Sequence, residues 1–296
     1  MNAYPFDWVD AFSTRAFGGN ACMVVHGADG LGVEARMALV RETSLSECAF
    51  LVGSQRADFG ARYYLADKEI LMAGHPTIAV VASLLSRGLV ALEEGRAEFT
   101  LEVGAGVLPI AVEETSGGFV ITMTQMEPTF GETLDRAEIA ALYGLEAEDI
   151  LTTPQVVSTG TPFVITVLRS KDALRRATLD PEKWRALNPP GTAREGMLEP
   201  FLVSLGGVDG GDTFSRLLLP APLPPEDPFT GSATGCMAAY LWHYGLIDRP
   251  RFIAEQGHWM GRPGRAEVEV LGLRAAPVGV RVAGQGRVLM RGELLL

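Results

Sequence analysis

Apolar residues occupy every side of a short segment that follows a Gly-His-Pro sequence. Residues 76–85 read PTIAVVASLL, so a helix here would be apolar all round. Such a helix is enclosed by other structure rather than lying on a surface. Pro76 suits the first helical turn, because its missing N–H would be unsatisfied there, and Gly88 suits the end. The pattern therefore predicts a buried helix beside Gly74 and His75.

Most other apolar positions fall in short runs that are rich in Val and aromatic residues and are punctuated by Gly. Such runs are typical of strands. An exception is EARMALVRET at 34–43, whose apolar spacing predicts a helix. Much of the chain is therefore expected to be sheet. The clearest strand-like runs are ACMVVHG at 21–27, LSECAFLVG at 45–53, ARYYLADKEIL at 61–71 and QVVSTGTPFVITVL at 155–168.

The pattern around the first buried helix recurs later in the chain at an offset of 157 residues. EILMAGHPTIAVVASLLSRGL at 69–89 aligns there with EDPFTGSATGCMAAYLWHYGL at 226–246, which places Ser232 opposite His75. Isolated Glu and Gly residues match at this one offset, which argues against a chance coincidence of two Gly- and Ala-rich helix starts. Both halves are therefore expected to carry one unit: a strand, a Gly turn and a buried helix ended by Gly.

Each of these two helices begins at a Gly with a polar residue beside it. A helix start offers free backbone N–H groups and the positive end of the helix dipole, and such ends bind anions. If the halves face each other, Gly74-His75 and Gly231-Ser232 are expected to hold a substrate carboxylate or oxyanion.

Composition narrows the function further. At 296 residues and 47% hydrophobic, the chain can bury a large core in one large domain or about two domains. With 36 acidic against 25 basic residues and no basic run, nucleic acid is not an expected partner. No long apolar window or secretion signal stands out, so we expect a cytoplasmic protein without a membrane span. The three cysteines form no CxxC pair and are expected to be small buried thiols.

Five ordered motifs resemble those of the phenazine-biosynthesis-like isomerase family, which shares its fold with diaminopimelate epimerase and proline racemase. The resemblance implies an α+β fold of two pseudo-symmetric lobes, each a curled, mostly antiparallel sheet around a central helix, with the active site in the cleft between them. We expect lobes at about residues 1–115 and 116–280, with 281–296 returning to the first, and a homodimer. The motifs are VDAF with GGN near the start, LSECAF at 45–50, Glu69 with AGHPT at 73–77, EDPFTGSA at 226–233 and EQGHWMGRPG at 255–264.

The resemblance also implies an enzyme without metal or organic cofactor that moves protons on small carboxylic acids. Cysteine racemases of this fold place a thiol directly before each helix-start Gly, whereas this chain has Ala73 and Thr230 there, so a two-thiol mechanism is not expected. Ala21 and Cys48 depart from the family pattern. These departures bear on the identity of the substrate more than on the type of reaction. The implied site residues are Asn20, Ser46, Glu47, Gly74, His75, Asp227, Gly231 and Ser232, with Glu47 as the acid/base.

Three of these residues carry the expected chemistry. Glu47 lies in an apolar run, and a buried carboxyl usually has a raised pKa that lets it take and return a proton near neutral pH. The alternative is a Glu on an edge strand that faces solvent. His75 is expected to donate to a substrate carboxylate or enolate, or else simply to cap the helix. Asp227 is a second acid/base or an amine binder, or else an ordinary turn residue.

Other chemistries fit the sequence less well. GSATG around Ser232 lacks both the spacing of a nucleophile elbow and the Lys of a phosphate-binding loop. His26, His243 and His258 lack metal-site spacing and are expected to be packing or surface residues. Two alternatives to an isomerase remain: an epimerase or racemase of a small amino or hydroxy acid, and a non-catalytic protein that binds a small acid.

Overall fold

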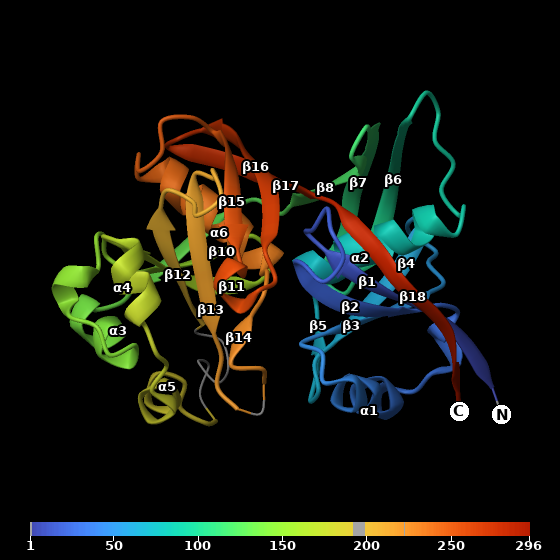
Figure 1. The fold of residues 1–296 in the computed structure, drawn as a ribbon, viewed down its shortest axis with the longest axis horizontal. Helices are drawn as coiled ribbons and strands as arrows, with labels where there is room; N and C mark the ends of the chain where they lie inside the picture. The colour runs from blue at the N-terminus through green and yellow to red at the C-terminus, as the bar shows by residue number, and fades with distance from the viewer. Residues whose placement is uncertain (1, 192–198, 222) are drawn as a thin grey trace. The chain divides into compact units, whose positions relative to one another are not determined.

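The computed structural model describes residues 2–191, 199–221 and 223–296 and has a sheet-dominated α+β fold (Figure 1). The chain divides into two compact units. The first unit comprises Met1–Thr124, Gly261–Ala266 and Val282–Leu296, and the second comprises Gln125–Met260 and Glu267–Arg281. The expected α+β class is confirmed. None of the helices in the described part of the chain is long and apolar enough to cross a membrane.

The first unit contains most of the N-terminal strands together with the last strand of the chain. Its two α-helices are α1 (Val33–Thr43), which confirms the helix expected at 34–43, and α2 (Gly74–Ser86). Its strands are β1 (Ala3–Ala11), β2 (Asn20–Val25), β3 (Cys48–Val52), β4 (Phe59–Tyr64), β5 (Glu69–Ile70), β6 (Arg96–Val103), β7 (Gly106–Thr115), β8 (Gly118–Gln125) and β18 (Gly286–Leu295).

The second unit carries the other strands and helices, and β16 and β17 each extend into residues of the first unit. Its α-helices are α3 (Arg136–Leu142), α4 (Lys171–Arg176), α5 (Pro181–Leu187) and α6 (Gly231–His243). Its strands are β9 (Thr129–Thr133), β10 (Gln155–Ser158), β11 (Pro162–Leu168), β12 (Pro200–Leu205), β13 (Thr213–Leu218), β14 (Glu226–Asp227), β15 (Arg251–Gln256), β16 (Gly264–Leu273) and β17 (Ala276–Gly284).

Strand pairing follows the same order of directions in each unit. In the first unit β1–β2 is antiparallel, β2–β3 parallel, β3–β4 and β4–β5 antiparallel, and β4–β6 parallel. In the second unit β10–β11, β11–β12, β12–β13, β13–β14 and β13–β15 repeat these directions in turn. Parallel neighbours need a crossover connection, and helices occupy these crossovers, with α2 between β4 and β6 and α6 between β13 and β15.

The helices α2 and α6 are the buried helices expected from the sequence. Each has 13 residues, and α6 starts and ends 157 positions after α2. Every residue from Gly74 to Leu84 and from Gly231 to Leu241 is buried, which confirms that both helices are enclosed. Helix α2 packs against β1, β2, β3 and β18, and α6 against β10, β11 and β12. Each unit thus wraps strands around one apolar helix, and the start of that helix lies inside the unit.

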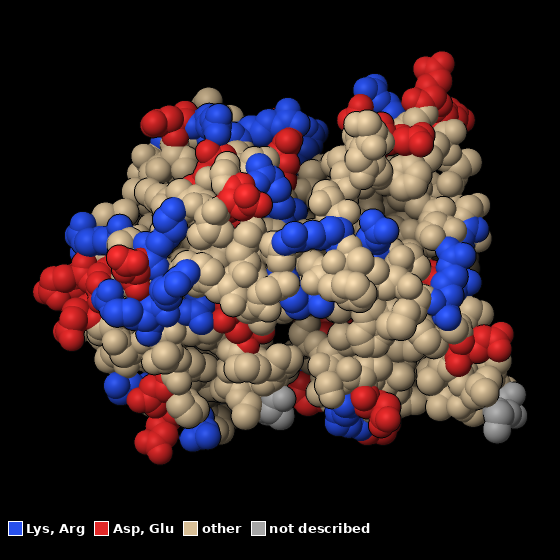
Figure 2. All heavy atoms as spheres, in the orientation of Figure 1, with Lys and Arg blue, Asp and Glu red and all other residues tan. Residues whose placement is uncertain are grey.

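Charged side chains of both signs are interspersed on the face of the molecule drawn in Figure 2. Elsewhere on the surface, exposed residues of neighbouring strands pair, as Arg281 of β17 does with Glu269 of β16, whose Nη1 and Oε2 atoms are 3.2 Å apart. Exposed pairs of this kind contribute at most about 1 kcal/mol of stability. The folding of the chain therefore depends on its buried contacts rather than on these surface pairs.

Candidate active site

Glu47 does not lie inside a strand, as its apolar neighbours had suggested. It lies in the connection from α1 to β3, one residue before the strand begins at Cys48. Cys48 is the first residue of this run to pair with both neighbouring strands, opposite Met23 and Tyr64. The Glu47 side chain is 19% exposed, so its carboxylate is mostly buried but retains contact with solvent. Both sequence interpretations, a carboxylate inside a strand and one on a solvent-facing edge strand, are therefore wrong.

His75 is the second residue of α2, and its side chain is 4% exposed. Its Nδ1 lies 3.1 Å from Nδ2 of Asn20, the first residue of β2. An amide nitrogen can only donate, so Nδ1 accepts, and the neutral ring carries its proton on Nε2. Ala73 is the N-cap of α2 and makes no side-chain cap hydrogen bond. His75 Nδ1 contacts Asn20 and its Nε2 has no partner among the described residues, so the interpretation of His75 as a helix cap is wrong.

Burial sets the charge state of this histidine. It lowers the pKa of His75 from 6.5 to about 3, so the imidazole is neutral at ordinary pH. Glu47 Oε2 lies 3.8 Å from His75 Nδ1, and because the ring is neutral this contact is not an ion pair. Within the described residues, His75 Nε2 and Ser46 Oγ are buried and have no hydrogen-bond partner. Leaving a buried hydrogen-bond donor unsatisfied costs free energy. Unsatisfied groups of this kind are typical of sites at which a ligand atom accepts the hydrogen bond.

The starts of α2 and α6 differ from those of α3, α4 and α5. Neither has a side-chain cap or an acidic residue in its first turn. By contrast, side chains of Asp135, Ser170 and Asp180 cap α3, α4 and α5. Caps satisfy the N–H groups that a helix start leaves unpaired. Together with the unpartnered nitrogen of His75, the uncapped start of α2 provides several donors for an anionic group.

In the second unit, Asp227 belongs to a small buried polar network. It is the last residue of β14, pairs with Leu217 and is 5% exposed, so it is a strand residue and not the turn residue considered above. The Thr230 hydroxyl donates to Asp227 Oδ2 at 2.6 Å. Gln256 Nε2 donates to the Asp227 carbonyl at 2.7 Å, and Gln256 Oε1 accepts from the Thr230 N–H at 3.0 Å.

Thr230 and Gln256 were not among the expected site residues. The sequence signal for Gln256 is its place in EQGHWMGRPG, and that for Thr230 is its position directly before Gly231. The structure thus brings Asn20, Glu47 and His75 together in the first unit. It brings Asp227 together with the start of α6 in the second.

The three cysteines are buried, as expected. Burial raises the pKa of Cys48 to about 12, although the Thr43 hydroxyl lowers it somewhat, and burial raises that of Cys236 to about 11. Cys22 is likewise shifted upward by burial, so its pKa also lies well above the usual value. Thiols that resist ionisation are poor nucleophiles and bases. Among the described residues, no three His, Cys, Asp or Glu side chains form a group that could hold a metal ion.

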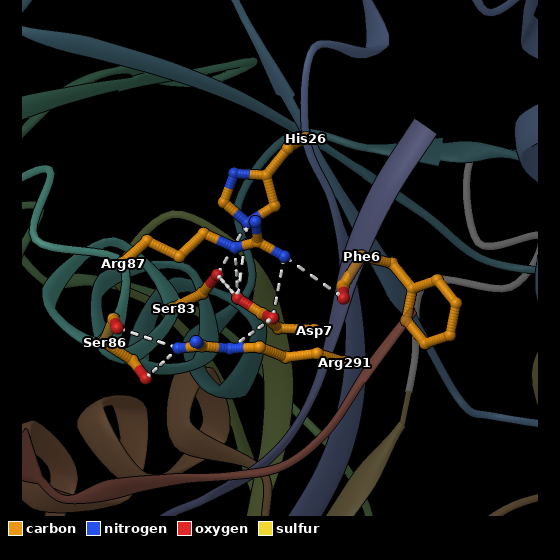
Figure 3. A network of polar contacts seen from close by, with 7 residues as sticks. All are labelled: Phe6, Asp7, His26, Ser83, Ser86, Arg87 and Arg291. Atoms are coloured by element: carbon orange, nitrogen blue, oxygen red, sulfur yellow. Dashed lines mark hydrogen bonds and ion pairs between the residues drawn. The ribbon is translucent and has the colours of Figure 1, made fainter. Parts of the chain in front are cut away.

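A buried carboxylate anchors the other end of α2 (Figure 3). Asp7 on β1 is fully buried and accepts from Arg87 Nε and Nη2 at 2.7 and 2.9 Å, and from the Ser83 hydroxyl at 2.6 Å. His26 Nε2 lies 2.7 Å from Ser83 Oγ, and Arg291 Nε lies 3.3 Å from Asp7 Oδ1. Burial alone would raise the pKa of Asp7, but the hydrogen bonds from Arg87 and Ser83 outweigh it and lower the pKa. His26 therefore belongs to the polar network at the C-terminal end of α2.

Comparison with known proteins assigns the class. A solved hydroxyproline epimerase from Agrobacterium vitis shares the fold, with a TM-score of 0.68 over 99% of this chain and 92% of that chain at 16% identity. The uncharacterized isomerase YfhB of Bacillus subtilis is 30% identical over 88% of each chain. Trans-2,3-dihydro-3-hydroxyanthranilate isomerase of Pseudomonas aeruginosa is 29% identical over 97% of this chain and 98% of its own. The chain is accordingly an enzyme of the isomerase class.

The family follows from a match over nearly the whole chain. The model of the phenazine biosynthesis-like protein family matches residues 9–292, and the chain belongs to this family. A solved phenazine biosynthesis protein of the PhzF family from Bacillus anthracis superposes with a TM-score of 0.85 over 100% of both chains at 27% identity. The expected family is thereby confirmed.

Proposed function

We propose that the protein is a cofactor-independent isomerase in which Glu47 moves a proton on a small carboxylic acid. One observation carries the proposal: a partly exposed carboxylate lies 3.8 Å from a buried histidine whose Nε2 has no partner among the described residues. A base beside an unsatisfied donor is the combination that proton abstraction next to a carbonyl requires.

Each group in the first unit has a distinct role in this mechanism. Glu47 removes a proton from a carbon next to a carbonyl or conjugated acid and returns it elsewhere on the molecule. The Nε2–H of His75 donates to the substrate oxygen on which negative charge develops. The uncapped N–H groups at Gly74 and His75 stabilise the same charge through the helix dipole. Burial supports the role of His75, because a neutral imidazole donates without competing as an acid.

In the second unit we assign Asp227 as a further acid/base or amine-binding group, with Gly231 and Ser232 as substrate-binding residues. The Thr230 hydroxyl, which donates to Asp227 Oδ2 at 2.6 Å, holds this carboxylate in one orientation. The first turn of α6 has no side-chain cap at Thr230, which supports a role for this helix start in binding an anionic group.

Exchange of substrate hydrogen with solvent deuterium tests the proposal directly. We would incubate the protein in D2O with a panel of small unsaturated carboxylic acids, including the substrate named for the Pseudomonas aeruginosa relative, and follow deuterium by mass spectrometry. We expect exchange in at least one acid, and its loss in Glu47→Gln. The matched control is Glu113→Gln, a carboxylate on β7 whose side chain is 56% exposed. Binding of an acid without exchange would instead identify a non-catalytic binding protein.

Epimerisation or racemisation of a small amino or hydroxy acid is the second candidate, because the fold is shared with a hydroxyproline epimerase. The same carboxyl base would serve it. Neither α2 nor α6 has a cysteine at its N-cap, where Ala73 and Thr230 stand, so such a reaction would not use two thiols. Loss of optical rotation in a chiral acid, with no change in its constitution, would favour this candidate over the isomerase.

We also propose that the two units are pseudo-symmetric lobes and that the enzyme is a cytoplasmic homodimer. The identical order of strand pairing supports the first point, and the unpaired cysteines support the compartment. Met290 on β18 is 53% exposed, and Leu295 and Leu296 at the end of the chain are 58% and 54% exposed. Exposed apolar residues along a strand support self-association. Light scattering coupled to size exclusion tests the dimer, and a monomer at micromolar concentration would contradict it.

A further inference from the structure

A loop of eight residues, 12–19, turns the chain from β1 to Asn20, the residue that contacts His75. Asp10 of β1 is 1% exposed, and its two carboxylate oxygens have different partners. Oδ2 accepts the backbone N–H of Phe17 at 2.6 Å. Oδ1 accepts from Arg262 Nη2 at 2.7 Å. One buried carboxylate therefore joins the turn to an arginine that is distant in sequence.

Arg262 holds the turn at a second point. Its Nε donates to the Gly19 carbonyl at 2.9 Å and its Nη2 to the Gly18 carbonyl at 3.1 Å, directly before Asn20. The Gly19 N–H in turn donates to the Pro263 carbonyl at 3.0 Å. The planar guanidinium thus contacts the carboxylate and both carbonyls at once, through two nitrogens held in a fixed geometry.

The turn has little freedom to rearrange without breaking these bonds. A Cβ at Gly18 would lie 2.4 Å from Ser13 Oγ, and Gly19 adopts a φ of +56°. Phe17 adopts a φ of 65°, which is strained for a residue other than glycine, although its side chain is 73% exposed. Such strain persists only where surrounding contacts determine the conformation, and it is concentrated at functional sites. The Asp10–Arg262 pair supplies those contacts.

We propose that Asp10 and Arg262 are positioning residues that hold Asn20 against His75 and thereby keep the Nε2 of His75 protonated as a hydrogen-bond donor. Arg262 acts on the carbonyl next to Asn20, and Asn20 Nδ2 lies 3.1 Å from His75 Nδ1. The use of that donor by a substrate rests on the proposed function, whereas the positioning itself does not.

The energetic reason is the choice between two neutral forms of the ring. If Asn20 moves away, the proton can lie on Nδ1 instead, and Nε2 then presents a lone pair that repels a substrate oxyanion. A hydrogen bond that contributes about 1 kcal/mol favours one form roughly fivefold. A flexible loop would lose that preference, whereas the ion pair between the buried Asp10 and the partly exposed Arg262 holds Asn20 in place.

Nuclear magnetic resonance of protein labelled with ¹⁵N-histidine tests which ring nitrogen of His75 carries the proton, and it needs no substrate. The chain has four histidines, so the two ring nitrogens of His75 can be assigned by comparison with a His75→Gln variant. In the wild type we expect the form with Nε2 protonated to predominate about fivefold. Arg262→Met removes the three donated bonds and keeps an unbranched stem, and should bring the two forms of His75 closer to equal populations. Asp10→Asn, a milder variant that can still accept from Phe17, should show the same change to a smaller degree.

The Asp7–Arg87 pair provides a matched control. It is a second buried Asp–Arg pair that also begins on β1, but it contacts the far end of α2. Arg87→Met should lower stability while leaving the Nε2-protonated form of His75 predominant, and Asn20→Ala should reproduce the more even mixture. An unchanged ring in folded Arg262→Met or Asp10→Asn, or an equal change in Arg87→Met, would overturn the inference. Because no turnover is measured, these outcomes are independent of whether Glu47 is the base.

Discussion

Replacing Asn20 with Asp should reverse the protonation of His75. The two side chains have nearly the same shape, but the substitution puts a carboxylate where an amide donor lies 3.1 Å from Nδ1. Asn20 is 2% exposed and His75 is 3% exposed, so solvent screens the new charge weakly. A carboxylate accepts hydrogen bonds and cannot donate them, so Nδ1 must carry the proton.

The size of the effect follows from the distance. Two unit charges 3.1 Å apart attract by roughly 5 kcal/mol at an effective dielectric constant of about 20. Each 1.36 kcal/mol changes a pKa by about one, so this attraction raises the pKa of His75 by at most roughly 4. The pKa would move upward from about 3, and the free-energy cost of burying the new carboxylate would reduce the rise. The titration midpoint of His75 should therefore lie above that of the wild type.

A pH titration followed through the ring nitrogens of His75 measures both changes. We expect Nδ1 to be protonated in Asn20→Asp and the midpoint to lie above that of the wild type. Asn188→Asp introduces the same group at a residue of the second unit that is 3% exposed, and should leave His75 unchanged. If the Asn20→Asp protein is folded and its His75 still titrates near pH 3 with Nε2 protonated, the contact and the reasoning built on it are refuted.

Three further predictions concern catalysis and stability. Glu47→Gln should reduce turnover by at least roughly 10²-fold, with a much smaller change in ligand affinity. Asp227→Asn should reduce turnover less if that residue mainly orients the ligand. Steady-state kinetics and solvent deuterium exchange measure both effects. Cys48→Ser and Cys236→Ala should retain most activity, and loss of activity in both would favour a thiol mechanism. Asp7 has a pKa below its usual 3.8, so its contribution to stability is present above that pH and is lost as pH falls through the lowered value. Urea unfolding at a series of pH values should show this loss in the wild type but not in Asp7→Asn.

Local pattern was sufficient to predict the two central helices. An apolar segment with Pro76 near its start and Gly88 after its end satisfies the rules of helix entry and exit without any long-range information. The recurrence of the same pattern at Gly231 predicted the second helix, and α6 begins there. Burial also followed, because a helix that is apolar on every side is stable only when it is enclosed.

The motif residues of the candidate site were identifiable from the sequence, but their arrangement was not. Glu47 looked like a strand residue because its neighbours are apolar, yet β3 begins only at Cys48, where pairing with β2 and β4 starts. Strand pairing is a contact between distant segments, and periodicity within one segment does not report it.

The sequence by itself determined which segments are apolar, where helices begin and end, and which polar residues stand beside those ends. Only the tertiary structure decided that Asn20 donates to His75, 55 positions later, and that Arg262 holds the Gly19 carbonyl across 243 positions. The physical reason is that helix entry depends on neighbours within a few residues. The protonation of a buried ring depends instead on donors and acceptors that the folded chain brings within about 3 Å.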